Sequence, residues 1–394
     1  MRIVFVASRF PYPVEKGDKL RAFHQIRLLS IDHEIHLVAV SHQAIAPEYI
    51  RAMEPYCKSI RIFRINKWLL PLQLLLGWFE GLPLQISYFL DRTIKRKVQY
   101  HIIHLEPDHV FCQLIRAAPY VRALPFPKTL DYMDVFSVGM TQLAERTKPF
   151  GFLFKWEAAR LAAYERTIYK DFDHHTIISA QDRNRLKLAS SDHVMVIPNG
   201  VDPSFLSYHA HRAPAFDVVF VGNLGYGPNK EAALYLVNSL QPELLKMGLS
   251  INILLAGARP GNKLKRLTQP GQVTVKGWVE DIREAYADGR ILVAPMFSGL
   301  GQQNKILEAM AMGLPCVTST MVNNAIGAVI NKEILVGDTA KDLAGHIYQL
   351  LTNNDLYQQM ANAGKEFVQR NYKWEDQVAK LETVLNSKNV YVQS

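Results

Sequence analysis

The chain has 394 residues, of which 48% are hydrophobic and 21% charged, and this length favours two or three domains with substantial cores. Three widely separated cysteines without a C-x-x-C pair argue against a disulfide framework or a structural zinc site and suit a reducing cytoplasm. Lysine and arginine exceed aspartate and glutamate by 45 − 36 = 9, which suits an anionic partner unless the excess only keeps the surface solvated. Because no signature of a nucleic-acid-binding module is present, we expect no nucleic-acid partner.

The first apolar run, residues 3–7, is too short for the hydrophobic region of a signal peptide and predicts a buried strand. The most apolar later stretch, residues 68–79, is interrupted by Pro71, Gln73 and Gly77 and falls short of the about 20 residues that a membrane span needs. We therefore expect no transmembrane helix and a cytoplasmic protein, either free or at the inner face of the cytoplasmic membrane.

Short apolar runs alternate with segments of helical period in both halves, which predicts βαβ units built on parallel sheets. In the first half we expect strands at 3–7, 35–40 and 174–179, with a helix between the first two. In the second half we expect strands at 217–221, 250–256, 273–276, 290–294 and 315–319. The pattern predicts an α/β protein with two doubly wound, Rossmann-like domains.

A segment rich in proline and glycine, residues 197–203, interrupts the apolar pattern, and we place the hinge there. The predicted domains are 1–203 and 204–371. Residues 372–394 form an amphipathic C-terminal helix, which we expect to pack back toward the N-terminal domain. Two such domains facing each other form a cleft at the carboxyl ends of their strands, where doubly wound sheets bind ligands.

The most informative local motif is SGLGQQNKILEAMAMGLP, residues 298–315, which predicts a loop containing Gly299 and Gly301 followed by a helix. Unpaired amides at the start of such a helix suit a phosphate, and glycine lets a ligand approach the backbone. Lys305 and Glu308 share one helix face, where a lysine can neutralise a diphosphate and a carboxylate can accept both hydroxyls of a ribose. From spacing alone, an exposed ion pair explains these two residues equally well.

Residues 298–315 resemble the donor-binding loop and helix of family 4 glycosyltransferases, whose members carry a glutamate followed by Ala-Met-Ala and Gly-x-Pro. Pro-Asn-Gly-Val-Asp at 198–202 is similar to their hinge, and VGNLGYGPNK at 221–230 is similar to the first loop of their C-terminal domain. These motifs follow the family order and cover most of the chain from residue 198 onward. Residues 9–19 and 130–135 look like the branch associated with bacterial exosortase and exopolysaccharide loci.

The resemblance implies a GT-B architecture in which the N-terminal domain holds the acceptor and the C-terminal domain holds a nucleotide-sugar, either a UDP- or a GDP-sugar. It also implies transfer with retained anomeric configuration and no metal or other cofactor. Glu308 matches the glutamate that binds the ribose, and Gly17 matches a glycine beside the diphosphate. The expected donor-binding residues are Gly17, Gly222, Asn223, Lys230, Gly299, Leu300, Gly301, Gln302, Gln303, Asn304, Lys305 and Glu308.

Two positions depart from the family pattern. Leu300 stands where the family has a second glutamate, eight positions before Glu308, so that contact is absent or replaced by the neighbouring glutamines. Asn223 stands where many members carry an arginine, which makes Lys305 the candidate cation at the diphosphate and Lys230 the second choice. A lysine keeps the charge but lacks the forked geometry of a guanidinium.

Catalysis needs preorganised positive charge against the leaving diphosphate, so Lys305 is the expected catalytic cation. Asp131 and Asp134 follow a predicted strand and either could orient the acceptor hydroxyl, although each could instead cap a turn. We expect a retaining glycosyltransferase that extends a glycan or a lipid-linked acceptor in bacterial polysaccharide or glycoconjugate synthesis. The alternatives are a UDP-sugar epimerase of the same architecture and a non-catalytic nucleotide-sugar-binding protein, which Leu300 would explain.

Basic and apolar residues alternate over 58–64, and the apolar stretch 68–79 follows. This combination suits peripheral association with an acidic membrane surface. Burial of both segments as an ordinary strand and helix is the favoured interpretation.

Overall fold

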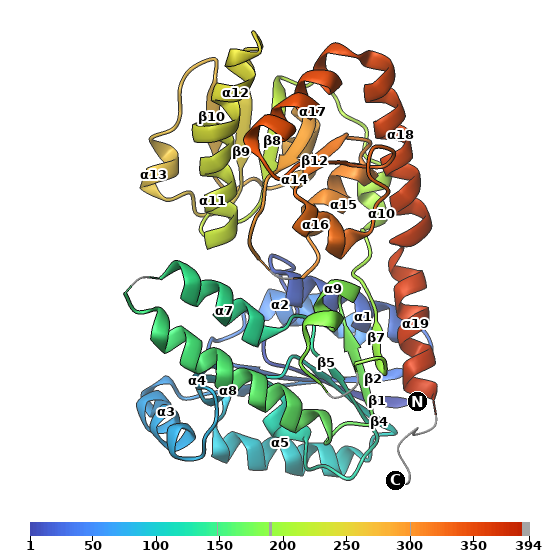
Figure 1. Cartoon of the computed structure of the whole chain (residues 1–394). Helices are drawn as coiled ribbons and strands as arrows, with labels where there is room; N and C mark the ends of the chain where they lie inside the picture. The colour runs from blue at the N-terminus through green and yellow to red at the C-terminus, as the bar shows by residue number, and fades with distance from the viewer. Residues whose placement is uncertain (148, 189–190, 300, 388–394) are drawn as a thin grey trace. The chain divides into compact units, whose positions relative to one another are not determined.

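The structure is a computed structural model that describes residues 1–147, 149–188, 191–299 and 301–387. The chain forms two compact units, which Figure 1 shows in colours that run along the chain. Unit 1 comprises the residues up to Asn199 together with the segment from Trp374, and unit 2 runs from Gly200 to Lys373. Each unit is an α/β structure with a parallel sheet, as the alternating sequence pattern predicted.

The observed unit boundaries differ by a few residues from the predicted positions after 203 and 371. Asn199 stays in unit 1 because its side chain accepts a hydrogen bond from Arg21 (3.1 Å). Val201 already belongs to unit 2, where its amide donates to the carbonyl of Tyr372 (2.7 Å). The chain therefore changes units directly at the glycine of the Pro-Asn-Gly-Val-Asp motif.

The sheet of unit 1 has the strand order β3-β2-β1-β4-β5-β6-β7. Its strands are β1 (Arg2–Ala7), β2 (Glu34–Ser41), β3 (Ser59–Arg64), β4 (His109–Gln113), β5 (Lys128–Asp131), β6 (His174–Ile177) and β7 (Val194–Val196). The predicted strands at 3–7, 35–40 and 174–179 correspond to β1, β2 and β6. The sequence pattern did not indicate β4 and β7, which have only five and three residues.

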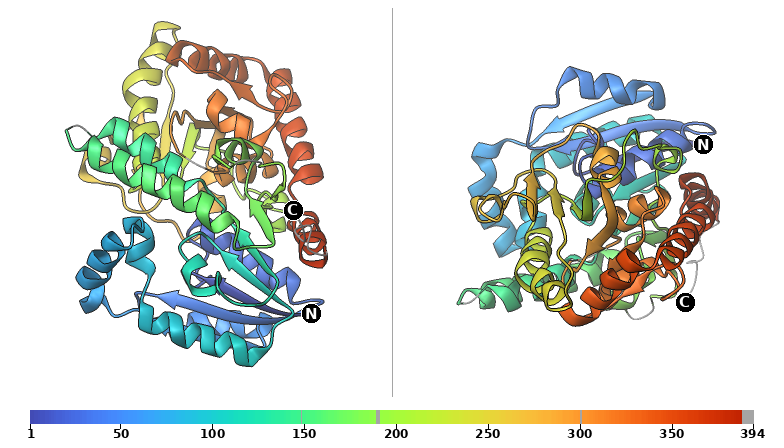
Figure 2. Two further views of the ribbon diagram at one scale, coloured as in Figure 1. Left: turned by 60° about the horizontal axis from the view of Figure 1, so that its bottom comes forward. Right: turned by 90° about the horizontal axis from the view of Figure 1, so that it is seen from above.

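Helices cover both faces of this sheet (Figures 1 and 2). They are α1 (Gly17–Leu29), α2 (Pro47–Met53), η1 (Glu54–Tyr56), η2 (Lys67–Leu69), α3 (Leu70–Phe79), α4 (Leu84–Phe89), α5 (Arg92–Leu105), α6 (Ala118–Val121), α7 (Phe136–Arg146), α8 (Gly151–Tyr169), α9 (Ala180–Arg185) and α19 (Trp374–Asn386). Alternate residues of β1 enter different cores: Ile3 and Phe5 pack with α1 and α19, whereas Val4 and Val6 pack with α5 and α8. The C-terminal helix α19 thus completes one core of unit 1, with Leu381 fully buried in it.

The sheet of unit 2 has the order β10-β9-β8-β11-β12-β13. Its strands are β8 (Phe216–Val221), β9 (Ile253–Ala256), β10 (Val273–Lys276), β11 (Gly289–Ala294), β12 (Cys316–Thr318) and β13 (Leu335–Val336). Its helices are α10 (Pro203–Leu206), α11 (Gly227–Tyr235), η3 (Leu236–Leu240), α12 (Gln241–Lys246), α13 (Asn262–Lys265), α14 (Ile282–Ala287), α15 (Asn304–Ala311), α16 (Thr320–Ile326), α17 (Ala340–Thr352) and α18 (Asn354–Asn371). All five strands predicted for this half are present, and β13 was not predicted because it has only two residues.

The strand order of unit 2 reverses between β8 and β11, which are neighbours in the sheet although β9 and β10 lie between them in the sequence. Loops that leave the carboxyl ends of two such strands diverge to opposite faces, and the crevice between them is where open α/β sheets bind ligands. The segment after β8 carries Gly222, and the segment after β11 leads to α15. The topology therefore brings the two predicted donor-binding motifs to one place within unit 2.

The expectation that residues 68–79 are buried is wrong. The helix α3 buries only Gln73 and Gly77, and its leucine and aromatic side chains are largely exposed. The reason is that α3 packs on α4 through this narrow face, where a Cβ on Gly77 would lie 1.9 Å from Ser87 Oγ. Among the described residues, the helices are all too short or too polar to cross a bilayer.

Candidate functional site

Two glycines let the ends of β8 and β9 touch. The amide of Gly222 donates to the carbonyl of Ala256 (3.0 Å), and a Cβ on Gly257 would lie only 1.8 Å from the carbonyl oxygen of Gly222. Both glycines have positive φ angles, +156° and +141°. A Cβ on Gly222 would also lie 3.2 Å from Lys305 Nζ, so the bare backbone here makes room for a cation at the end of β8.

Lys305 occupies the second position of α15, and its ammonium group is held in unit 2 by neutral partners. Nζ donates to Asn229 Oδ1 (2.6 Å), contacts Met296 Sδ (3.3 Å) and lies 4.7 Å from the centroid of the Phe220 ring. Burial lowers the pKa of Lys305 to about 7, and the charge of Glu308 opposes this shift. The site therefore holds a partly desolvated cation that a bound anion would stabilise.

The loop that leads into α15 approaches the same place. Gly299 and Gly301 have φ angles of +122° and +68°, which a side chain would strain. Gln302 is buried, whereas Gln303 and Asn304 are half-buried at the amino end of α15. Leu300, the position at which the family pattern has a glutamate, lies outside the described residues.

Glu308 lies one turn beyond Lys305 on α15. Its Oε2 accepts a hydrogen bond from the hydroxyl of Tyr286 (2.6 Å), a fully buried residue of α14. Burial raises the pKa of Glu308, while the Tyr286 hydrogen bond and the charge of Lys305 lower it. Because Lys305 and Glu308 are half-buried and bonded to different partners, the interpretation as an exposed ion pair is wrong.

The two remaining predicted residues of this region have different positions. Asn223 shapes the turn after β8: its Oδ1 accepts from the amide of Gly225 (3.0 Å), and its carbonyl accepts from Asn229 Nδ2 (3.0 Å). Lys230 is half-buried on α11, directly after Asn229. Asn229 thus connects the turn to Lys305. The residue predicted for donor binding was its neighbour, Lys230.

Two of these contacts have almost no signal in the sequence. Asn229 lies within the motif 221–230 but 76 positions from Lys305, and nothing local marks it as the lysine's partner. Tyr286 lies 22 positions before Glu308 on another helix and has no motif of its own. Only the tertiary structure, which brings one side chain of α11 and one of α14 to side chains of α15, identifies both.

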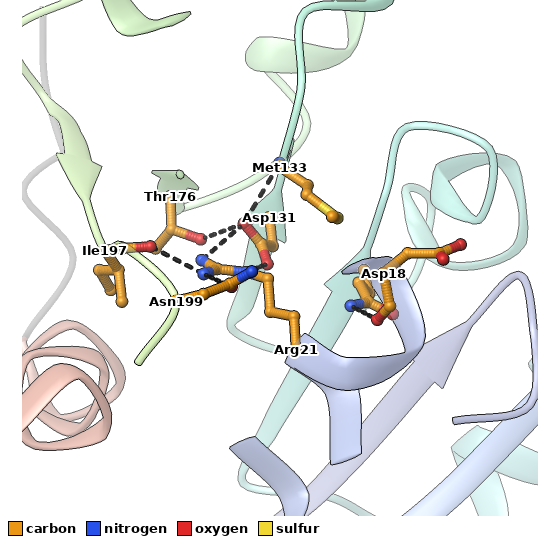
Figure 3. A network of polar contacts seen from close by, with 8 residues as sticks. Asp18, Arg21, Asp131, Met133, Thr176, Ile197 and Asn199 are labelled. Atoms are coloured by element: carbon orange, nitrogen blue, oxygen red, sulfur yellow. Dashed lines mark hydrogen bonds and ion pairs between the residues drawn. The ribbon is translucent and has the colours of Figure 1, made fainter. Parts of the chain in front are cut away.

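In unit 1, Asp131 is fully buried rather than available to an acceptor, so its prediction as a catalytic residue is wrong (Figure 3). Its carboxylate accepts hydrogen bonds from Arg21 Nε (2.6 Å), Arg21 Nη2 (3.2 Å), Thr176 Oγ1 (3.0 Å) and the amide of Met133 (3.3 Å). Arg21 Nη1 also donates to the carbonyl of Ile197 (2.7 Å). This network joins α1, β5, β6 and the segment after β7, which is a structural role.

Asp134 is half-buried in the turn that follows β5. Burial raises its pKa to about 7, the charges of Asp182 and Asp18 contribute to the rise, and Arg116 and Arg21 oppose it. Its carboxyl group can therefore gain or lose a proton near neutral pH. Of the two predicted aspartates, this is the one whose environment suits proton chemistry.

Gly17 lies beside the same turn of unit 1. It begins α1, is exposed, and a Cβ on it would lie 3.3 Å from Cε of Met133, the residue before Asp134. Met133 has a φ angle of +59°, which turns the chain sharply after β5. The fold thus brings together two predicted residues that are more than a hundred positions apart in the sequence.

Within the part of the chain that the structure describes, His, Cys, Asp and Glu side chains form no group of three or more that could hold a metal ion. Positive charge in the unit 2 site comes from the Lys305 ammonium and from the amino end of α15.

Comparisons with known proteins identify the fold. Residues 215–353, which lie within unit 2, match the family model described as "Glycosyl transferases group 1". Across 405 residues the chain is 21% identical to a 44.6 kDa protein in the cps region of Klebsiella pneumoniae, covering 94% of this chain and 96% of that protein.

Two solved structures illustrate the likeness. Anabaena HepE in complex with UDP and glucose has a TM-score of 0.68 at 14% identity, over 98% of this chain and 99% of that one. A TarM variant of S. aureus, in complex with fondaparinux, alpha-GlcNAc-glycerol and UDP, has a TM-score of 0.70 at 12% identity, over 98% and 100%. The two parallel-sheet halves therefore have the GT-B glycosyltransferase fold.

The buried ion pair of unit 1 leads to a stability prediction. Arg21→Met leaves the Asp131 carboxylate buried without its cation, and we expect the free energy of unfolding to fall by about 3–5 kcal/mol in chemical denaturation. The control is Arg2→Met, because Arg2 and Glu34 form a pair that is nearly half exposed, and we expect a change within about 1 kcal/mol. Equal losses in the two variants would contradict the structural role of Arg21.

Proposed function

We propose that this protein is a retaining glycosyltransferase that moves a sugar from a UDP- or GDP-sugar to a glycan or lipid-linked acceptor. The reaction would serve bacterial polysaccharide or glycoconjugate synthesis. The observation that carries the proposal is the Lys305 ammonium at the amino end of α15, next to Gly222 and one turn before the Glu308 carboxylate. The glycosyl transferases group 1 match and the UDP complexes of the similar structures support it.

Each part of the unit 2 site suits one part of such a donor. The diphosphate carries two negative charges, which the Lys305 ammonium and the first amides of α15 would neutralise. A carboxylate can accept hydrogen bonds from both hydroxyls of a ribose, and Tyr286 holds Glu308 in a fixed orientation for this. The glycine-containing loop before α15 would let the sugar approach the backbone.

The reaction breaks the bond between the anomeric carbon and the diphosphate oxygen and forms a bond from that carbon to the acceptor oxygen. Negative charge then develops on the departing diphosphate, where a fixed cation in a partly desolvated site is most effective. We assign this role to Lys305, and the proposed reaction would then need no metal ion. The acceptor hydroxyl must be oriented as it loses its proton, and we assign this role to Asp134.

The donor assignment is tested with Glu308→Gln. The amide still accepts the Tyr286 hydrogen bond but has lost the charge and the paired oxygens that bind a diol, so we expect donor affinity to fall at least about tenfold. Isothermal titration calorimetry with a panel of UDP- and GDP-sugars measures this. Tyr286→Phe is the control, because it removes only the hydroxyl that orients Glu308 and should have the smaller effect.

The products of the same panel distinguish the proposed function from its alternatives. Sugar transfer to an added acceptor supports a glycosyltransferase, whereas release of an epimerised sugar with UDP would indicate an epimerase. Donor binding without turnover would indicate a binding protein. Wild-type donor affinity in Glu308→Gln would contradict the ribose assignment.

The lowered pKa of Lys305 predicts that donor affinity depends on pH. The diphosphate binds the ammonium form, which is populated below the pKa of about 7 and is lost as the pH rises through it. The affinity should change little just below that pH and fall by up to about tenfold per pH unit above it. Lys305→Arg stays charged over this range and should remove the dependence; if the dependence persists, another group causes it.

The raised pKa of Asp134 predicts a separate effect on turnover. Its carboxylate form is needed to accept a hydrogen bond from the acceptor, so kcat at saturating donor should decline as the pH falls below about 7. Asp134→Asn should lower kcat by about a hundredfold or more and abolish this decline, while donor affinity stays unchanged. Loss of donor affinity in the variant, or an unaltered pH profile, would exclude the role.

A further inference from the structure

Unit 1 carries an apolar surface that nothing in the described structure covers. We define the α3 apolar surface as the outward side chains of η2 and α3, namely Trp68, Leu72, Leu75, Leu76, Trp78 and Phe79. Trp68 is 91% exposed, Phe79 78%, and Leu72 and Leu75 slightly more than half. No charged residue occurs between positions 68 and 79. Monomeric proteins rarely expose such contiguous apolar area unless it contacts a partner or a membrane.

The amphipathic pattern of α3 is inverted. The face that packs on α4 consists of Gly77, which lies against Ser87, and Gln73, whose Nε2 donates to Asp91 Oδ2 (3.1 Å). The side chains of Leu72, Leu75, Leu76 and Trp78 are exposed instead. A helix that contacts only its own unit normally buries its leucine and aromatic side chains and exposes its polar ones. The leucine face therefore serves a contact outside unit 1.

The surface extends to α8. The Trp78 ring stacks on that of Trp156 at a centroid distance of 4.5 Å, and the guanidinium of Arg160 lies over both rings at 5.2 and 4.3 Å. Phe152 and Leu153, which lie about one turn before Trp156 on α8, are exposed as well. Figure 1 shows α3 and α8 at the same side of unit 1. Two helices thus present tryptophan, phenylalanine and leucine together.

Exposed lysines flank two of the tryptophans in the sequence. Lys67 precedes Trp68, Lys155 precedes Trp156, and both lysines are exposed. Two neighbouring carboxylates are engaged: Glu80 pairs with Arg92 (2.6 Å), and the buried Glu157 accepts hydrogen bonds from the first amides of α4 (both 2.9 Å). Exposed aromatic and leucine residues bordered by lysine match the interfacial region of an anionic bilayer.

We propose that the α3 apolar surface docks unit 1 on an anionic lipid membrane, with α3 lying in the headgroup region. A helix of ten residues is about 15 Å long, so it can lie in this region but cannot span the bilayer. A second copy of the chain fits less well, because a symmetric contact would bring the lysines at the margin toward one another. Membrane docking would give the enzyme access to a lipid-linked acceptor, and this part of the inference rests on the proposed function.

The test uses the full chain and vesicles of phosphatidylcholine with and without phosphatidylglycerol. We expect cosedimentation with the anionic vesicles, a blue shift of tryptophan fluorescence as Trp68 leaves water, and weaker binding at high salt. Leu72→Glu/Leu75→Glu should weaken binding at least about tenfold. The matched control is Leu245→Glu, because Leu245 on α12 of unit 2 is 53% exposed and does not belong to the α3 apolar surface.

Several outcomes would overturn the docking inference. Equal binding by wild type and the double variant would do so, as would a failure of the wild type to bind anionic vesicles. A dimer that dissociates in the double variant, without vesicle binding, would show that the occupant is a second copy. Thermal unfolding at the wild-type temperature verifies that the double variant is folded.

The docking inference and the proposed function can fail separately. Donor affinity is measured without vesicles, and vesicle binding can be measured with Glu308→Gln. Vesicle binding without any nucleotide-sugar binding would support the docking inference and contradict the proposed glycosyltransferase function. Donor binding and sugar transfer without vesicle binding would do the reverse.

Discussion

The proposed donor site depends on one constraint: unit 2 holds a cation in a half-buried position where its direct contacts are with neutral groups. The Lys305 ammonium lies over an aromatic ring and donates to an amide oxygen, which compensate only part of the hydration it has lost. The lowered pKa expresses this deficit. An anion bound beside Gly222 would replace the hydration that the ammonium has lost. The partly desolvated environment that destabilises the ammonium by itself would therefore favour binding of a diphosphate.

Unit 1 contains a buried charge with the opposite arrangement. Arg21 and Asp131 neutralise each other, and neighbouring groups use their remaining donors and acceptors, so the pair holds the fold together and is closed to a ligand. Asp134, three residues later, has no such cation in direct contact among its described neighbours and has a raised pKa. The distinction between a structural and a chemical aspartate therefore lies in how completely the surroundings satisfy the carboxylate.

The helix α3 follows the same logic for apolar groups. Its buried face consists of the small or polar residues Gly77 and Gln73, and its exposed face consists of leucine and tryptophan. Unit 1 therefore leaves exposed the apolar side chains that a helix of a globular protein normally buries. The exposed lysines beside it add a preference for anionic surroundings. A donor site in unit 2 and a lipid-facing surface on unit 1 would suit an enzyme whose donor comes from water and whose acceptor is held in a membrane.

The sequence alone determined the features whose causes are local. The alternation of apolar runs predicted the two α/β units, and the motifs at 221–230 and 298–315 predicted the glycine turn and α15, because these depend on backbone conformation and nearest neighbours. Only the tertiary structure decided that Asn229 and Tyr286 hold Lys305 and Glu308, that Asp131 is closed off, and that α3 faces outward. These outcomes depend on which distant segments pack against each residue, and burial sets both the strength of a charge and the availability of an apolar face.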